Sequence, residues 1–236
     1  MICFENATKK YGKEFALKNM NLKIEKGKIY GLVGANGSGK STTLKMIAGL
    51  VRPNSGKVLV MGMPANRKIA ENVSYLTELD MFYEGFTIRQ MIEYTASQFL
   101  DFRIKKAEKL IEFMNLDFSK KIKNLSKGNR GRLKLVLSLS RDVPILLLDE
   151  PFSGLDPMVR ESIVKSLLTF LDFDKQTVVI TTHEIAEIEP ILDEIIVLNN
   201  GQFIAQHTVD QLREEQGQSV LEWMKENLNR EDLEKV

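Results

Sequence analysis

One eight-residue segment constrains the fold of this 236-residue chain more than any other. Residues 34–41 read Gly-Ala-Asn-Gly-Ser-Gly-Lys-Ser and match the pattern G-x-x-x-x-G-K-[ST]. An apolar, strand-like stretch at residues 28–33 comes directly before this segment, and a helical stretch at residues 40–50 overlaps its end. This strand–loop–helix order is the context in which the pattern forms a phosphate-binding loop. We therefore expect a parallel α/β sheet with an anion site at its carboxyl edge.

The residue types in the loop explain how it would hold phosphate. Glycines let the backbone curl so that successive N–H groups point at an anion, and the helix N-terminus adds partial positive charge. Lys40 is expected to reach the β- and γ-phosphates, and the Ser41 hydroxyl to ligate Mg²⁺. A glycine-rich turn without a ligand is the alternative, but it gives Lys40 and Ser41 no evident packing purpose. The expected phosphate-contacting residues are Gly34, Ala35, Asn36, Gly37, Ser38, Gly39, Lys40, Ser41 and Thr42.

The second candidate segment is the most apolar run of the chain, residues 143–149, which ends in adjacent carboxylates at Asp149 and Glu150. A buried strand that ends in this way places both carboxylates at the carboxyl edge of the sheet. Asp149 is expected to hold the Mg²⁺ shell, and Glu150 to orient and polarise an attacking water as general base. A strand ending in solvated acids is the alternative, and the upstream phosphate loop argues against it.

The apolar pattern along the chain indicates a mixed α/β fold. Several of the strand candidates are continuous runs of Val, Ile and Leu, as in strands buried on both faces of a mainly parallel sheet. Apolar residues recur at helical spacing in 88–99 and 104–114, and a third helix is expected at 130–141. The strand candidates are residues 2–7, 15–24, 28–33, 57–61, 72–76, 145–149, 177–182, 194–198 and 203–205.

This pattern predicts one domain over residues 1–215 and a short helical tail over residues 216–236. The core of the domain comprises residues 1–79 and 141–215, and a helical insertion occupies about residues 80–140. The tail carries apolar residues at helical spacing, and we expect it to serve packing or interaction and no chemistry.

The composition argues against several classes of protein. Lys and Arg number 33 and Asp and Glu 32, so the chain lacks the basic excess of a nucleic-acid binder. Cys3 is the only cysteine, so no internal disulfide can form, which suits a reducing cytosol. No apolar run approaches the roughly 20 residues that cross a bilayer, and the N-terminus does not read as a signal peptide. We expect a cytoplasmic protein that reaches a membrane only through a partner.

Further segments, taken in order, resemble the ATP-binding cassette (ABC) family. The resemblance covers about residues 1–210 and implies a P-loop NTPase (RecA-like) core with a mainly parallel sheet. It also implies an N-terminal antiparallel β subdomain and an inserted α-helical subdomain. The resembling segments are Tyr11 (adenine-stacking aromatic), residues 75–78 (start of the Q-loop), residues 125–129, Leu-Ser-Lys-Gly-Asn (LSGGQ signature), residues 153–156 (D-loop) and residues 181–183 (switch histidine).

The resemblance implies that two subunits sandwich two ATP molecules head to tail. Ser126 and Gly128 would cap the γ-phosphate of the nucleotide bound to the other subunit, and a helix N-terminus there offers N–H groups to an anion. His183 would contact the γ-phosphate and hold Glu150 and the water in register. A structural histidine at a strand end is the alternative for His183.

For the base of the nucleotide, the resemblance implies that Tyr11 stacks on adenine. Phe15 and Ala16 would complete that wall of the site. A tyrosine that merely packs in a β-hairpin is the alternative for Tyr11. His207 lies in no such motif, and we expect it at the surface.

Three residues depart from the family pattern. Lys127 and Asn129 replace a glycine and the closing glutamine of the signature, and Asn129 keeps hydrogen-bonding capacity with a shorter reach. Glu78 stands where many members carry the Q-loop glutamine. Its carboxylate could ligate Mg²⁺ or hold a water, but it adds negative charge beside the triphosphate. One hypothesis is pairing with a different ATPase subunit whose sites compensate.

The resemblance implies an ATPase that binds ATP and Mg²⁺ and powers transport through a separate membrane-spanning subunit, at the cytoplasmic face of the membrane. Its partners would be that subunit and a second ATP-binding subunit, in a homodimer or heterodimer, with no nucleic acid. Analogy favours export. The helical insertion and residues 78–89 would receive the membrane partner, and Phe82, Tyr83 and Phe86 there indicate either a partner surface or ordinary core.

Two other functions remain as alternatives. A soluble ABC ATPase acting on ribosome or DNA complexes usually has two cassettes or long coiled-coil insertions, and this chain has neither. A small-molecule kinase with a P-loop would leave the signature, the D-loop and His183 unexplained.

Overall fold

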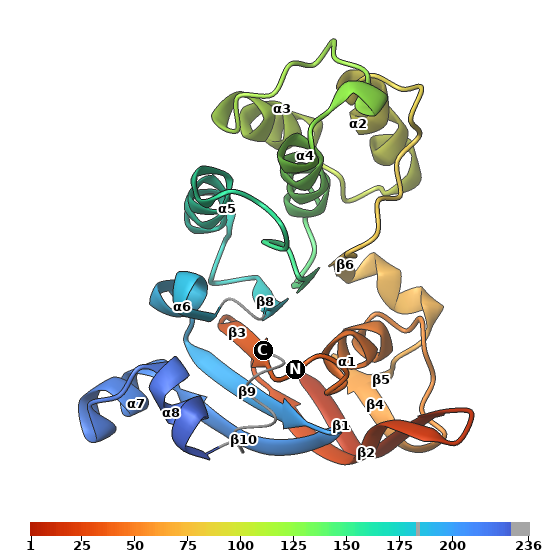
Figure 1. The fold of residues 1–236 in the computed structure, drawn as a ribbon. Helices are drawn as coiled ribbons and strands as arrows, with labels where there is room; N and C mark the ends of the chain where they lie inside the picture. Colours follow the sequence, from red (N-terminus) through yellow and green to blue (C-terminus); the bar gives the residue numbers. More distant parts are fainter. Residues whose placement is uncertain (183–184, 228–236) are drawn as a thin grey trace.

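The computed structural model describes residues 1–182 and 185–227, so the predicted site residue His183 and the end of the predicted tail lie outside the described residues. Two sheets and the helices packed against them make up the fold (Figure 1). None of the helices in the described ranges has the length and apolar character for a bilayer crossing. In chain order the elements are β1 (Ile2–Tyr11), β2 (Glu14–Ile24), β3 (Ile29–Val33), α1 (Lys40–Ile47), β4 (Ser55–Val60), β5 (Met63–Pro64), η1 (Arg67–Glu71), β6 (Val73–Leu76), α2 (Ile88–Gln98), α3 (Ile104–Phe113), η2 (Ile122–Asn124), α4 (Lys127–Leu139), β7 (Ile145–Asp149), α5 (Pro157–Phe170), β8 (Thr177–Thr181), α6 (Ile185–Ile188), η3 (Glu189–Ile191), β9 (Glu194–Asn199), β10 (Gln202–Thr208), α7 (Val209–Gln216) and α8 (Val220–Asn227).

The larger sheet has the strand order β10-β9-β3-β8-β7-β6. Its strands β9, β3, β8, β7 and β6 pair in parallel, and β10 adds to β9 as an antiparallel edge strand. Every residue of β3, β7 and β8 is buried, because both faces of the sheet are covered. The carboxyl ends of β3, β7 and β8 therefore lie side by side at one edge. The predicted mixed α/β fold with a mainly parallel sheet is confirmed.

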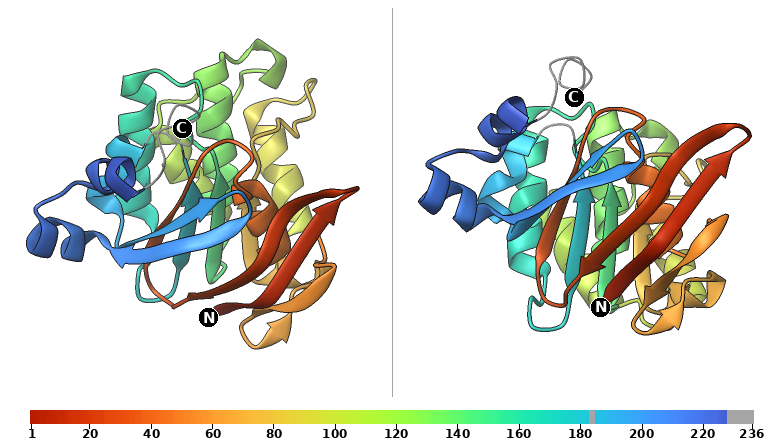
Figure 2. Two further views of the ribbon diagram at one scale, coloured as in Figure 1. Left: turned by 60° about the horizontal axis from the view of Figure 1, so that its bottom comes forward. Right: turned by 90° about the horizontal axis from the view of Figure 1, so that it is seen from below.

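The smaller sheet is antiparallel, with the order β2-β1-β4-β5. It encloses one hydrophobic cluster together with α1 and one face of the larger sheet. The two sheets also join at an edge, where the N–H of Lys18 on β2 donates to the carbonyl of Gly201 at 2.7 Å. Figure 2 shows the long β1–β2 ribbon lying alongside β9 and β10. The phosphate-loop segment lies beside this junction.

Helices α2 to α5 share a second hydrophobic cluster with the opposite face of the larger sheet. Thr87 opens α2 with a capping box to Gln90, which satisfies orphan N–H groups at the helix start. The end of α4 is tied to β6, because the hydroxyls of Ser74 and Ser138 lie 2.9 Å apart in the buried interior. Figure 1 shows α2, α3 and α4 gathered at one end of the molecule.

Several features differ from the sequence-based expectations. Helix α4 begins at Lys127 and not at residue 130, because Ser126 caps it by accepting from the N–H of Asn129. Helix α5 was not expected, although Asp156 and Pro157 provide a typical helix start. His207, expected at the surface, is half-buried, and its ring makes an unexpected contact 4.8 Å from the ring of Trp223 in α8.

Arg141 anchors the end of α4 to η1 and to the segment after α2. Its guanidinium pairs with Asp101, donates to the carbonyl of Ala70 at 2.7 Å, and stacks at 3.8 Å from the ring centre of Phe99. The Arg141 side chain is only 6% exposed. A charge buried to this extent is strongly destabilising when its partner is removed.

We expect Arg141→Met to lower the free energy of unfolding by about 3 kcal/mol, because it leaves the Asp101 carboxylate without its cation. Arg103→Met is the matched control, since Arg103 and Asp142 are 58% and 56% exposed. Breaking an exposed pair should cost less than about 1 kcal/mol. Urea denaturation measures both variants, and equal losses would contradict the anchoring role of Arg141.

Candidate active site

The loop between β3 and α1 has a backbone that only glycine accommodates at two places. Gly34 has a φ of 148° and Gly39 a φ of 106°. A Cβ atom on Gly34 would lie 2.1 Å from the carbonyl oxygen of Leu198, and one on Gly39 would lie 2.6 Å from that of Ala16. The loop is closed internally by the N–H of Ser38, which donates to the carbonyl of Ala35 at 3.0 Å. Its shape is therefore fixed by neighbouring backbone.

Lys40 begins α1, and its ammonium group folds back over the loop. The Nζ atom donates to the carbonyls of Gly34 and Ala35 at 2.6 and 3.3 Å and lies 4.0 Å from Oε1 of Glu150. The side chain is 7% exposed. Burial lowers the pKa of Lys40, while the negative charges of Glu150 and Asp149 oppose that shift. A cation held in this way is suited to a charge-assisted bond with phosphate.

Asp149, at the end of β7, is a buried carboxylate that accepts hydrogen bonds from three hydroxyl groups. Ser41 on α1 and Thr181 on β8 donate to Oδ1 at 3.0 and 2.9 Å. Tyr75 on β6 donates to Oδ2 at 2.8 Å. Burial, followed by the charge of Asp149, raises the pKa of Tyr75, so its hydroxyl remains a donor. Three different elements thus set the position of one carboxylate.

Glu150 follows directly and adopts a left-handed backbone with a φ of 48°. Its N–H donates to Oγ1 of Thr181 at 2.9 Å. A non-glycine residue in this region costs roughly 1–3 kcal/mol and is typical of functional sites. The carboxylate is 14% exposed and faces the Lys40 ammonium.

A pocket of about 500 Å³ brings these groups together with an aromatic wall. Tyr11 and Phe15 are 52% and 44% exposed, and lysine ammonium groups lie over both rings. A tyrosine with a packing role alone would be more deeply buried, so the exposure of Tyr11 favours a ligand contact. The pocket is lined by Tyr11, Glu14, Phe15, Ala16, Asn36, Gly37, Gly39, Lys40, Ser41, Thr42, Glu78, Glu150 and Ser153.

The predicted signature residues are not part of this pocket. Ser126 and Gly128 lie at the start of α4, where an ideal Cβ on Gly128 would meet Val159 of α5 at 3.2 Å. The neighbouring Lys127 lies over Gly154, where a Cβ would come within 2.0 Å of Nζ. Lys127 and Glu150 both line a second, smaller pocket of about 290 Å³. Within one chain, the signature loop therefore faces the segment after Glu150 and not the phosphate loop.

The residues of the site fit phosphate and Mg²⁺. Oγ of Ser38 is buried and has no hydrogen-bond partner among the described residues, as expected for a loop shaped for an anion. No cluster of three or more His, Cys, Asp or Glu suited to a metal is found in residues 1–182 and 185–227. Mg²⁺ beside a nucleotide needs only one or two protein oxygens, since phosphate and water supply the rest. The Ser41 and Asp149 pair meets that need.

Sequence reasoning assigned no role to Tyr75 or Thr181 at Asp149. Both residues lie in segments that the motifs included, but their contacts depend on β6 and β8 flanking β7, which the chain order does not reveal. Glu14 was also not expected in the pocket. The position of Glu14 beside Tyr11 in the β1–β2 hairpin could have predicted its place in the pocket.

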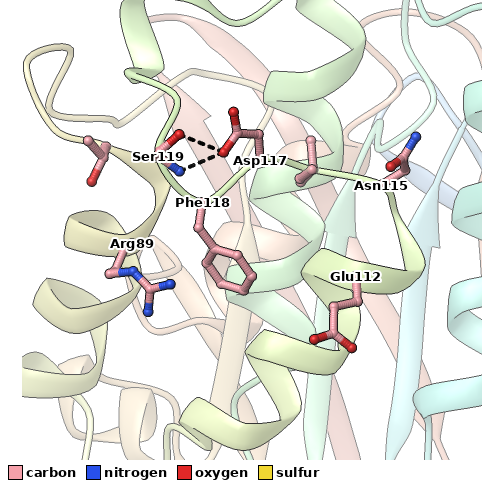
Figure 3. A pocket seen from close by; sticks show the side chains of 8 residues that line it. Arg89, Glu112, Asn115, Asp117, Phe118 and Ser119 are labelled. Atoms are coloured by element: carbon pink, nitrogen blue, oxygen red, sulfur yellow. Dashed lines mark hydrogen bonds between the residues drawn. The ribbon is translucent and has the colours of Figure 1, made fainter.

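Further concave surfaces lie outside this site, and two of them involve the helical region. A pocket in the helical region, lined in part by Arg89 and Phe118, has satisfied polar groups: both the N–H and the hydroxyl of Ser119 donate to Asp117 (Figure 3). The Arg89 guanidinium lies 4.7 Å from the ring centre of Phe118. The second surface is an apolar groove of about 290 Å³ between the end of α1, β6, α2 and α4.

Comparisons with known proteins agree with one another. A family model described as "ABC transporter" matches residues 17–153. The Nod factor export ATP-binding protein I of Burkholderia orbicola is 34% identical over 87% of this chain and 70% of its own length. The ABC transporter ATP-binding protein YtrB of Bacillus subtilis is 31% identical over 84% of this chain and 69% of its own length. An uncharacterised ABC transporter ATP-binding protein of Nostoc is 32% identical over 85% of this chain, which spans only 62% of that relative.

Solved structures of ATP-binding cassettes are also similar to this chain. The dimeric structure of the cassette MJ0796 has a TM-score of 0.78 and 28% identity, and covers 88% of this chain and 98% of its own. A dimeric post-hydrolysis state of MJ0796 bound to ADP and Pi has the same TM-score and 27% identity over the same shares of both chains. An ATP-binding subunit of an ABC transporter reaches a TM-score of 0.83 at 24% identity over 97% and 100% of the two chains, a likeness of fold.

The loop geometry predicts unequal effects for two glycine substitutions. Gly34→Ala places Cβ against a backbone carbonyl that cannot yield, so we expect nucleotide binding to be lost. Gly37→Ala is the control, because Gly37 has a φ of 81° but no atom within 4 Å of an added Cβ. It should cost only about 1–2 kcal/mol of stability from backbone strain. Binding of a fluorescent ATP analogue and urea denaturation measure both, and equal binding losses would contradict the steric account.

Proposed function

This chain belongs to the ABC transporter family, and from that premise we propose that it binds and hydrolyses ATP to power a separate membrane-spanning transporter subunit. The observation that carries the proposal is the pocket in which Tyr11, Lys40 and Glu150 meet. An aromatic face, a buried cation above a glycine-rich loop and a carboxylate match the base, the phosphates and the attacking water of an ATPase.

The proposed reaction is attack of water on the γ-phosphorus, which forms one O–P bond and breaks the bond to the bridging β–γ oxygen. Lys40 and the loop N–H groups bind the phosphate oxygens and hold the γ-phosphate in line. Glu150 accepts a proton from the water as its oxygen attacks. Its position 4.0 Å from the Lys40 ammonium supports this role, because it places the carboxylate beside the group that would bind the phosphates.

Mg²⁺ would be held by Ser41 and Asp149, with Glu78 on the pocket wall as a further oxygen donor. The ion would neutralise charge on the phosphate oxygens. The Ser41 hydroxyl donates to Asp149 and keeps its lone pairs for the cation, so both residues can serve together. Glu78 lines the same pocket as Ser41, which supports its place in this set.

Recognition of adenine is proposed for Tyr11, with Phe15 and Ala16 completing the wall. Tyr11 and Phe15 both line the pocket and keep about half of their surface exposed, which supports stacking on the base. His183 is proposed to contact the γ-phosphate on the strength of its motif.

A second ATP-binding subunit is proposed to complete each site. Ser126 and Gly128 lie at a helix N-terminus outside the pocket of their own chain, so they are available to a nucleotide on another subunit. The dimeric MJ0796 cassettes support such an arrangement.

The membrane-spanning partner is proposed to dock an apolar helix into the groove beside β6. The groove wall includes Leu50, Leu79 and Met81, which are 59%, 74% and 76% exposed. Exposed apolar side chains of this size mark an interaction surface. Similarity to proteins named for Nod factor export supports export, and we propose that the chain works at the cytoplasmic face of the membrane.

Glu150→Gln should bind ATP with near-normal affinity but hydrolyse it about 10³-fold more slowly, because the amide cannot accept the proton. Glu14→Gln is the matched control, since it removes a charge from the same pocket at a residue with no proposed role in the reaction. Phosphate release and fluorescent-nucleotide binding measure both variants. Near-normal turnover of Glu150→Gln would refute the assignment of the general base.

Leu79→Asp should abolish recovery of the membrane partner when the tagged protein is isolated from its own cells in mild detergent. The variant should fold normally, because this side chain is 74% exposed. Leu100→Asp is the control, as Leu100 is fully exposed and does not line the groove. Identification of the co-purified proteins by mass spectrometry tests the proposal. Recovery of ribosomes or DNA-repair proteins with the unsubstituted chain, and of no membrane protein, would favour a non-transport ATPase.

A further inference from the structure

Tyr75 occupies a distinctive place between two surfaces of the molecule. It lies on β6, the edge strand of the larger sheet, and is paired with Leu147 of β7, two residues before Asp149. Its ring packs against the cluster around α1 and lines the apolar groove. Its hydroxyl lies 2.8 Å from Oδ2 of Asp149. Tyr75 is not among the residues that line the nucleotide pocket.

The two oxygens of Asp149 are not equally supported. Oδ1 accepts from both Ser41 and Thr181, whereas Tyr75 is the one donor to Oδ2 within the described part of the chain. Rotation about the last bond of an aspartate is soft, so hydrogen bonds decide the plane of the carboxylate. Donors on Oδ1 alone would leave Oδ2 free to swing around them. The Tyr75 hydroxyl removes that freedom.

We propose that Tyr75 is a positioning residue for ATP hydrolysis, whose hydroxyl fixes the Asp149 carboxylate in the orientation that holds Mg²⁺ together with Ser41. The inference rests on the proposed role of Asp149 at the metal. Outer partners of this kind set the geometry of metal-binding groups, and their loss weakens metal affinity by about 10–100-fold. Tyr75 acts through Asp149 and touches neither the base nor the phosphates.

The proposal predicts a selective defect in Tyr75→Phe, which keeps the ring and removes only the hydroxyl. The Mg²⁺ concentration for half-maximal ATP hydrolysis should rise about ten-fold. Binding of Mn²⁺ to the ATP complex, measured by electron paramagnetic resonance, should weaken by a similar factor. Affinity for a fluorescent ATP analogue in EDTA should stay within two-fold (about 0.4 kcal/mol) of the unsubstituted protein, because the phosphate loop is untouched.

Tyr30→Phe is the matched control for a merely structural effect. The Tyr30 side chain is fully buried, and its hydroxyl accepts a hydrogen bond from the N–H of Glu25 at 3.0 Å. It lies at the amino end of β3, at the opposite edge of the sheet from the loop. Tyr30→Phe should lose stability in urea but keep its Mg²⁺ and Mn²⁺ dependence.

Two results would overturn the proposal: an unchanged Mg²⁺ and Mn²⁺ dependence in Tyr75→Phe, or an equal shift in Tyr30→Phe. Asp149→Asn separates this failure from a failure of the proposed function. If Asp149→Asn abolishes the binding of Mn²⁺ while Tyr75→Phe leaves it intact, the role of Tyr75 is wrong and the metal assignment stands. If neither variant changes Mn²⁺ binding, Asp149 does not bind the metal. The proposed metal role of Asp149 and the proposed positioning role of Tyr75 then both fail.

Discussion

The close approach of three backbones at the start of α1 is the constraint on which the rest of the structure depends. Gly34 and Gly39 lie against the carbonyls of Leu198 and Ala16, on strands from two different sheets. The N–H of Gly201 also donates to the carbonyl of Ser38 at 3.1 Å. The loop is therefore shaped where the antiparallel sheet meets the parallel one. Because the loop cannot relax, Lys40 and Ser41 leave it in fixed directions.

The buried carboxylate of Asp149 extends that constraint across the sheet. An unpaired carboxylate in this environment would be costly, and hydrogen bonds offset its loss of water. Its donors Ser41, Tyr75 and Thr181 come from α1, β6 and β8. Each of these three elements is itself packed in the larger sheet or its hydrophobic core. The position of the carboxylate therefore depends on how the three elements are spaced. The same Thr181 hydroxyl accepts the N–H of Glu150 and thereby links the two adjacent acids.

The sequence predicted the parts of this site that depend on local order. The glycine loop between strand and helix, and the two acids after an apolar strand, are features of consecutive residues, and the structure places Lys40, Ser41 and Glu150 along one pocket. Contacts set by strand order could not be predicted in this way. Tyr75 reaches Asp149 only because β6 lies beside β7, and Lys127 covers Gly154 only because α4 packs on α5. The ring contact between His207 and Trp223 likewise depends on where α8 returns.

Helix α4 joins the signature loop to the nucleotide pocket by a direct physical route. The helix runs from Lys127 to Leu139, and its Lys134 ammonium donates to the carbonyls of Thr77 and Glu78 at 3.3 and 2.6 Å. The Glu78 side chain lines the nucleotide pocket. Because a hydrogen-bonded helix moves as a unit, a shift at its first turn must carry Lys134 with it. The backbone at Thr77 and Glu78 then either follows Lys134 or loses these two hydrogen bonds.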